Sequence, residues 1–176
     1  FKTESYDTPD KVVPKAASFA AGISIVYITL TVIWAFMLWG AGMSIFDSIA
    51  HAMTTLATGG YSTKSESLAA FNSSTIEIII IFGMLVGSLP FVHYLTLSKN
   101  GLKNLIKDDQ VKLFLTLVFF VVLIMSLYLS SNNMPYLEAL RLASFNVISI
   151  ITGTGFGTSD FSNWGGFPTT ILLILM

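Results

Sequence analysis

Two short stretches rich in glycine and hydroxyl side chains are the parts of this sequence best suited to chemistry. Neither stretch has a charged side chain, so a ligand there would meet main-chain carbonyl oxygens. Glycine permits dihedral angles that turn successive carbonyls the same way, and a ring of such oxygens can replace the water around a cation. Neutral oxygens suit an alkali cation, whereas a divalent site would contain carboxylates. The candidate ion-binding residues are Ala57, Thr58, Gly59, Gly60 and Tyr61 in the first stretch and Thr152, Gly153, Thr154, Gly155 and Phe156 in the second.

Each glycine stretch follows a short apolar segment, over residues 44–57 and 135–151. Ser44 and Asp47 form a capping box that predicts the start of the first short helix. About 13 helical residues reach only about 20 Å, against roughly 30 Å of bilayer hydrocarbon. We therefore expect each short helix to enter a membrane partway and to point the negative end of its dipole, which favours a cation, at the glycine loop.

The composition and the long apolar runs predict an integral membrane protein. Hydrophobic residues make up 53% of the 176 residues and charged residues 11%, and the mean hydropathy is +0.75. These values exclude a disordered chain, a nucleic-acid binder and a typical soluble enzyme. The absence of cysteine excludes a disulfide framework and a thiolate metal site. Spanning helices are predicted over 16–39, 78–97 and 113–129, with a kink at Pro90 in the second.

The order long helix, short helix, glycine loop, long helix occurs twice. A shift of 95 residues places Gly60 on Gly155 and Tyr61 on Phe156. The last apolar run begins at Pro168, which suits the first residue of a helix, and reaches only about 14 Å. We therefore expect a fragment whose last helix is truncated.

The placement of lysine predicts an orientation. Residues 1–15 and 98–112 hold seven of the nine basic residues, which makes these segments cytoplasmic under the positive-inside rule. Both glycine loops then face the outside. An excess of acidic residues on the outer side would weakly favour cations there. These acids are Asp47, Glu66, Glu77, Glu138 and Asp160.

Residues 57–63 and 150–156 resemble the second and third filter loops of the TrkH/KtrB potassium-uptake proteins (the Trk/Ktr/HKT superfamily). The resemblance covers essentially the whole chain. It implies an all-α integral membrane fold of potassium-channel-like helix–pore loop–helix repeats, two of a probable four, arranged parallel around one pore. The implied segments are a cytoplasmic linker (1–15), the second repeat (16–100), a cytoplasmic connector (101–112) and the third repeat (113–176), truncated in its last helix.

The resemblance also implies a function and partners. The obligatory glycines of the two repeats would be Gly60 and Gly155. In the first repeat, Ser62 stands where potassium channels have their last glycine, which suggests a shorter set of ion sites. The implied activity is gated potassium uptake across the cell inner (plasma) membrane, without enzyme chemistry or a cofactor and with potassium as the transported substrate. The implied partners are the remaining repeats of the same polypeptide, a second copy in a homodimer and a cytoplasmic nucleotide-binding subunit of TrkA/KtrA type. The gate would lie beyond Met176.

Three other functions stay open from the sequence. A sodium or mixed sodium/potassium carrier of the same fold would have serine at one repeat's glycine position, and only two repeats are visible. A secondary transporter with re-entrant hairpins predicts inverted copies, against the lysine placement. A membrane enzyme is disfavoured because the chain lacks paired carboxylates or a metal-ligand cluster at membrane depth.

Several single residues have simpler structural interpretations. We expect His51 to be a packing histidine and His93 to make an interface or helix–helix hydrogen bond. Glu77 is interpreted as the last member of a capping box that begins at Ser74. Arg141 is expected to pair with Glu138 or with a residue of another repeat outside this chain. The tryptophans are expected to be interface anchors: Trp34, Trp39 and Trp164.

Overall fold

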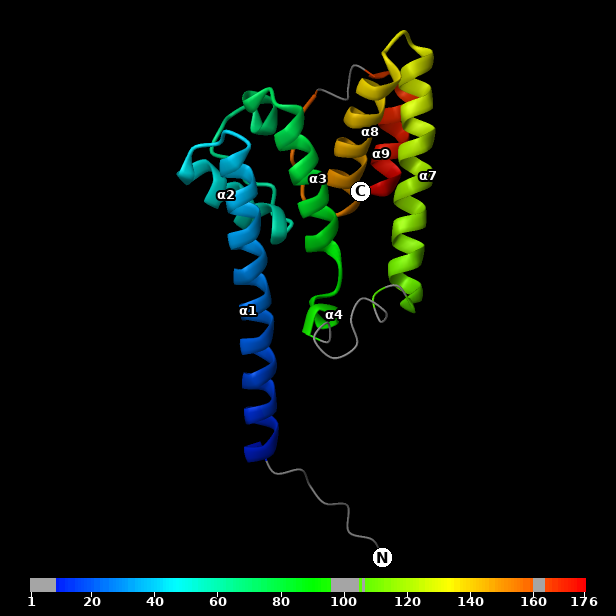
Figure 1. The fold of residues 1–176 in the computed structure, drawn as a ribbon. Helices are drawn as coiled ribbons and strands as arrows, with labels where there is room; N and C mark the ends of the chain where they lie inside the picture. The colour runs from blue at the N-terminus through cyan, green and yellow to red at the C-terminus, as the bar shows by residue number, and fades with distance from the viewer. Residues whose placement is uncertain (1–8, 96–104, 106, 160–163) are drawn as a thin grey trace, which may run out of the picture.

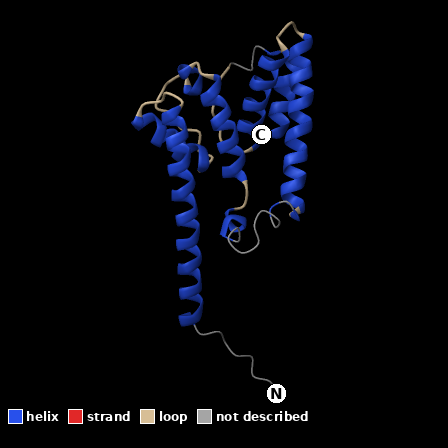
Figure 2. Ribbon diagram, in the orientation of Figure 1, coloured by secondary structure: helices blue, strands red, loops and turns tan. Residues whose placement is uncertain are grey.

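The structure, a computed structural model, describes residues 9–95, 105, 107–159 and 164–176, with side chains described from residue 16. Every regular element in these ranges is a helix, which confirms the predicted all-α class (Figure 2). The predictions for residues 1–8, for Lys99 and Lys103 in the connector and for Asp160 lie outside the described residues.

The first copy of the predicted unit lies within residues 9–95. Helix α1 begins at Pro9, earlier than the predicted residue 16, because a proline at the first helical position loses no hydrogen bond. Its apolar part, Ala16–Gly40, is long enough to cross a membrane. In Figure 1, α1 runs toward one end of the molecule and α2 and α3 return from that end. The elements are α1 (Pro9–Gly40), α2 (Ile45–Leu56), the 3-10 helix η1 (Ser67–Phe71), α3 (Ser74–Ser88) and α4 (Phe91–Leu95).

Local capping confirms one predicted helix start and corrects another. Ser44 caps α2, and its hydroxyl accepts from the Asp47 N–H as predicted. Helix α3 is capped by Ser73 rather than Ser74, so Glu77 is not the reciprocal member of a capping box. Pro90 separates α3 from α4 rather than kinking one long helix, because the residue before a proline disfavours the helical region; Leu89 is extended.

The second copy has the same order and runs in the same direction. Helix α9 begins at Gly166, and Pro168 lies in its first turn, where a missing N–H costs no helical bond. Figure 1 shows α7 rising to the end reached by α1, with α8 and α9 returning from it. The copies are therefore parallel, as the lysine placement predicts, and not inverted. The elements are α7 (Asp109–Ser131), α8 (Tyr136–Ile151) and α9 (Gly166–Leu175).

Helix α3 lies close against the end of α2 because two glycines one turn apart face it. A Cβ at Gly83 would lie 2.6 Å from Cγ2 of Thr55, and one at Gly87 would lie 2.7 Å from the carbonyl oxygen of Leu56. Small residues at this spacing permit close helix contact in membrane proteins. The end of α2, where the first glycine loop begins, is thereby fixed by α3.

Trp34 lies in the core, so its predicted role as an interface anchor is wrong. It is only 9% exposed, and its indole N–H donates to the carbonyl oxygen of Ile79 at 3.0 Å. The core around it joins both units, since it includes Ile80 of α3 together with Phe145 and Phe156 of the second unit. Trp39, in contrast, is 53% exposed.

Candidate functional site

The two glycine loops touch each other at Gly60. Gly60 has a φ of +65°, and a Cβ there would overlap the carbonyl oxygen of Thr154 and lie 3.2 Å from the carbonyl carbon of Gly155. Glycine is therefore required at this position for two reasons: the positive φ angle and the lack of space beside the neighbouring loop. The structure brings together the two stretches that the sequence predicts to act as one site.

The backbones of the two loops follow the same path. Positive φ angles occur at Thr58 (48°) and Gly60 in the first loop and at Gly153 (71°) and Gly155 (84°) in the second. Each pair is related by the shift of 95 residues. Threonine rarely adopts a positive φ, and such strain persists only where the surroundings impose it. Residues with positive φ alternate with residues of negative φ, so the backbone turns at equivalent points in both loops.

Each loop is held to its own short helix by a side-chain hydroxyl. Thr54 Oγ1 donates to the carbonyl oxygen of Tyr61 at 2.9 Å, and Ser149 Oγ donates to that of Phe156 at 2.7 Å. Both contacts join residues seven apart, and the two pairs are equivalent under the same shift. Neither hydroxyl is among the site residues that the sequence predicts; the only signal for them is a serine or threonine at the same place in each short helix.

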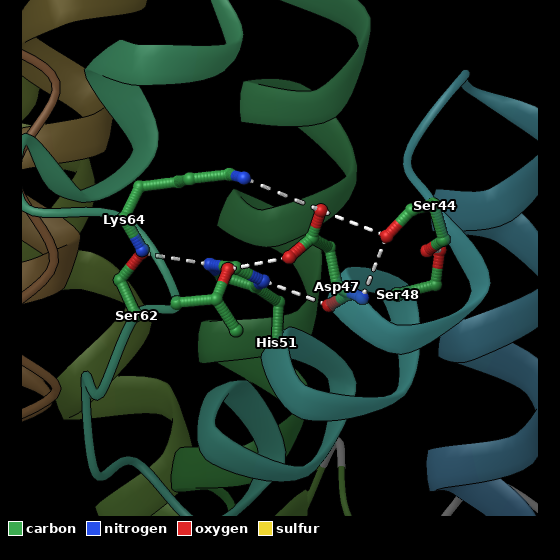
Figure 3. Close-up of polar contacts among 7 residues, drawn as sticks. Ser44, Asp47, Ser48, His51, Ser62 and Lys64 are labelled. Carbon is green, nitrogen blue, oxygen red and sulfur yellow. Dashed lines mark hydrogen bonds and ion pairs between the residues drawn. The ribbon is translucent and has the colours of Figure 1, made fainter.

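A network around Asp47 ties the chain after the first loop back to α2 (Figure 3). The Asp47 carboxylate accepts from the hydroxyls of Ser44, at 2.8 Å, and Thr63, and lies 3.8 Å from Nζ of Lys64. Asp47 is buried and its oxygens are already engaged. Lys64 offsets its charge, so Asp47 adds little to the predicted acidic excess on the outer side.

His51 links the first unit to the second loop. Its Nδ1 lies 2.7 Å from the Asp47 carbonyl oxygen and its Nε2 2.9 Å from Ser62 Oγ (Figure 3). Because a carbonyl only accepts, Nδ1 carries a proton, and the Ser62 hydroxyl, which can donate or accept, pairs with Nε2. The ring is buried between Phe71, edge-on at 5.2 Å, and Phe156, stacked at 6.0 Å. His51 is thus a satisfied packing histidine, as predicted.

The chain after the second loop is anchored from both units. Asn146, which is equivalent to His51, lies within 3.5 Å of Thr158 Oγ1 and 3.3 Å of Ser159 Oγ. From the first unit, Leu68 donates its N–H to the Gly157 carbonyl oxygen at 3.1 Å, and Ser67 Oγ accepts from the Gly157 N–H. No pattern in the sequence indicated that η1 would hold the second loop.

An ion pair joins the two units at Arg141 and Glu77. The distance from Nη1 to Oε2 is 2.7 Å, and the side chains are 27% and 8% exposed. The pairing overturns both predicted partners of Arg141, since Glu77 belongs to this chain and Glu138 is exposed. Glu77 is available because Ser73, not Ser74, caps α3, which leaves its carboxylate to meet α8.

The two aromatic residues at the ends of the loops have different surroundings. Phe156 is 3% exposed because the first unit covers it, whereas Tyr61 is 80% exposed. In the first unit, Phe46 and Met53 of α2 are also exposed. The first unit therefore keeps an open face where the second unit has a covered one.

The donor set fits an alkali cation better than a divalent metal. Among the described residues there is no group of three histidine, cysteine or acidic side chains that could hold a metal ion. The loops offer main-chain carbonyl and hydroxyl oxygens, which are neutral. His93 lies away from the loops, with Nε2 2.8 Å from Oδ2 of Asp108, the predicted helix–helix kind of hydrogen bond.

Comparison with known proteins identifies the family. The TrkH family model, described as a cation transport protein, matches residues 8–176. The chain is 35% identical to the Trk system potassium uptake protein TrkI of Halomonas elongata, over 94% of this chain and 34% of that protein. It is 35% identical to TrkH of Escherichia coli K12, over 93% of this chain and 35% of that protein.

A solved structure agrees with this match. The crystal structure of the potassium transporter TrkH from Vibrio parahaemolyticus superposes with a TM-score of 0.87 at 30% identity, covering 92% of this chain and 36% of that one. The chain thus spans about a third of the length of these relatives. The predicted fold class, helical repeats with pore loops in a membrane protein, is the one found. The chain belongs to the TrkH family of cation transport proteins.

Proposed function

We propose that this chain forms two of the loops of a potassium-selective filter in a protein that takes potassium into the cell. Main-chain carbonyls within the two loops, residues 57–61 and 152–156, would replace the water around the ion. The observation that carries the proposal is the contact between the loops at Gly60 and Thr154. Two longer relatives, of which this chain covers about a third, are named potassium uptake proteins, which supports the choice of ion.

Two further features support a cation pathway. Helices α2 and α8 end at Leu56 and Ile151, directly before the loops, and the negative ends of their dipoles favour a cation there. An open pocket of about 410 Å³ lies at the end of α2, beside the first loop. Its lining includes Tyr27, Ala57, Thr58, Gly87 and Phe91.

The open face of the first unit supports a larger ring of repeats. Phe156 is covered by the unit that precedes it, so Tyr61 would be covered in the same way by a further unit of the same polypeptide. Such head-to-tail contacts repeat around an axis and form a closed ring when the rotation between neighbouring units closes. We propose four repeats around one pore.

The proposed setting is the cell inner membrane, with the loops toward the outside and the lysine-rich connector toward the cytoplasm. Two helices, Ala16–Gly40 and Asp109–Ser131, are long and apolar enough to cross a membrane. The proposed partners are a second copy of the protein and a cytoplasmic nucleotide-binding subunit of TrkA/KtrA type. These assignments rest on the family relationship, and transport involves no bond chemistry.

Uptake by cells tests the proposal. The full-length gene is expressed in cells that lack their own potassium uptake, and growth at low potassium and rubidium influx are measured for the parent, Gly60→Asp and Gly155→Asp. The proposal predicts rescue by the parent and loss of selective flux in both variants. Unchanged flux and ion preference in both would refute the filter. Sodium-dependent rescue by the parent would favour the sodium or mixed carrier instead.

A further inference from the structure

We propose that the hydroxyls of Thr54 and Ser149 are positioning groups that shorten the filter by directing the carbonyls of Tyr61 and Phe156 toward their own short helices. The inference rests on the proposed function and concerns which oxygens of the loops are left for the ion. The carbonyls that remain belong to residues 57–60 and 152–155.

The hydroxyl of Ser149 differs from other hydroxyls at the ends of the short helices. Thr55 and Thr152 donate to the carbonyl four residues earlier, at 2.6 and 2.7 Å, the usual local bond of a helical threonine. Ser149 donates instead to Phe156, seven residues later and beyond the end of α8. A local helical bond therefore does not account for the contact of Ser149.

The contact of Thr54 is weaker than that of Ser149. Thr54 Oγ1 lies 2.9 Å from the Tyr61 oxygen, 3.1 Å from that of Ala50 and 3.4 Å from that of His51. A hydroxyl has one hydrogen to donate, and the nearest acceptor is Tyr61. Ser149 is 1% exposed, and its bond to Phe156 is the shorter of the two. We therefore expect a larger effect from Ser149.

A hydrogen-bonded carbonyl is a poorer ligand for a passing cation. The hydroxyl occupies one of the two lone pairs of the oxygen and fixes the direction of the C=O bond. Burial strengthens this hold, because water does not compete for the hydroxyl. A free carbonyl at the same place could turn toward the pore and would offer a less selective extra ligand. The hydroxyls thus determine where the row of ion-facing oxygens ends.

Removal of each hydroxyl in the full-length protein tests the inference. Rubidium influx is measured against rising sodium in cells that lack potassium uptake, for Ser149→Ala and Thr54→Val. In both variants, rubidium influx is expected to be inhibited by sodium concentrations about three- to tenfold lower than in the parent. This fold-change corresponds to the free energy of about one lost hydrogen bond. Ser149→Thr and Thr54→Ser keep a hydroxyl and should restore the parent's preference. Thr55→Val, which removes a local helical bond without changing shape, is the matched control.

The outcomes separate this inference from the proposed function. If Gly60→Asp and Gly155→Asp change ion preference while Ser149→Ala and Thr54→Val do not, the filter stands and the inference is wrong. If none of the four changes it, the proposed function fails as well. Protein in the membrane is quantified for every variant. Ser149→Cys, whose thiol donates only weakly, replaces any variant that does not accumulate, and an unchanged preference in it would overturn the inference.

Discussion

Arg141 of α8 and Glu77 of α3 form a 2.7 Å ion pair between two units that are far apart in the sequence. The pair lies where the second short helix meets the first unit, and the carboxylate is nearly buried. It holds α8, and with it the second glycine loop, against the first unit. The ion pair therefore helps to fix the position of the two glycine loops relative to each other.

Removal of both partners should destabilise the protein by less than the two single removals added together. Glu77→Ala leaves the Arg141 charge without its partner, and we expect a loss of about 2–4 kcal/mol, seen as a lower melting temperature of the detergent-purified full-length protein. The double variant with Arg141→Ala should lose less than the sum of the single variants. Glu138→Gln, on the same helix but exposed, should melt like the parent. Additive losses would show that the pair does not couple the units.

His51 should stabilise the site through its hydrogen bonds as well as its ring. His51→Phe keeps a ring between Phe71 and Phe156 but loses the bonds to Ser62 and to the Asp47 carbonyl, for an expected loss of about 1–3 kcal/mol. His51→Ala also removes the ring, for about 3–5 kcal/mol in total. Melting temperatures should fall in the order parent, Phe variant, Ala variant. A Phe variant as stable as the parent would assign His51 to packing alone.

Gly87 should not tolerate a methyl group. A Cβ there would meet the Leu56 backbone, which cannot move aside without shifting the start of the first loop. We expect Gly87→Ala to lose about 1–3 kcal/mol and to reduce rubidium influx. Gly40→Ala is the matched control, since nothing lies within 4 Å of a Cβ there. If the two variants have the same melting temperature and the same rubidium influx, the close contact between α2 and α3 contributes to neither stability nor transport.

The Asp108 carboxylate predicts a dependence on pH at the connector. The N–H of Gln110 holds the pKa of Asp108 below its ordinary value, with smaller contributions from Val111 and His93. A lowered pKa in the folded state means that the stabilisation is present above the ordinary value, about 3.9, and is lost as the pH falls through the folded value.

Thermal stability at several pH values measures this contribution. The parent should lose stability below about pH 4, and Asp108→Asn should lose less over the same range. Asp109→Asn, whose side chain is 94% exposed, should follow the parent. If Asp108→Asn and the parent have the same acid profile, the carboxylate does not provide this stabilisation.

The sequence predicts the elements of this fold well because they depend on local patterns. Long uncharged runs predict α1 and α7, and Ser44 with Asp47 predicts the start of α2. The parallel order of the units follows from the two glycine loops and the lysine placement. Proline and capping signals predict boundaries less well: Ser73 caps α3 instead of Ser74, and Pro90 ends that helix instead of kinking it.

The contacts between the units could not be predicted from one sequence. The Arg141–Glu77 pair and the stacking of His51 on Phe156 join residues without a shared local pattern. The sequence does not place Trp34 in the core because an indole with one polar N–H fits a membrane interface and a helix–helix contact equally well. Its place in the core depends on Gly83, which is recognised only once α3 is set against α1.

The ion preference of Gly60→Ala, measured beside Gly157→Ala, tests most directly whether the two loops form one selective site. In the full-length protein reconstituted in lipid bilayers, the ratio of potassium to sodium permeability is read from reversal potentials. Gly60→Ala should lower this ratio at least tenfold, because its methyl group overlaps the Thr154 carbonyl, whereas Gly157→Ala has open space and should keep it. An unchanged ratio in Gly60→Ala, with the protein conducting, would contradict a filter built by these loops.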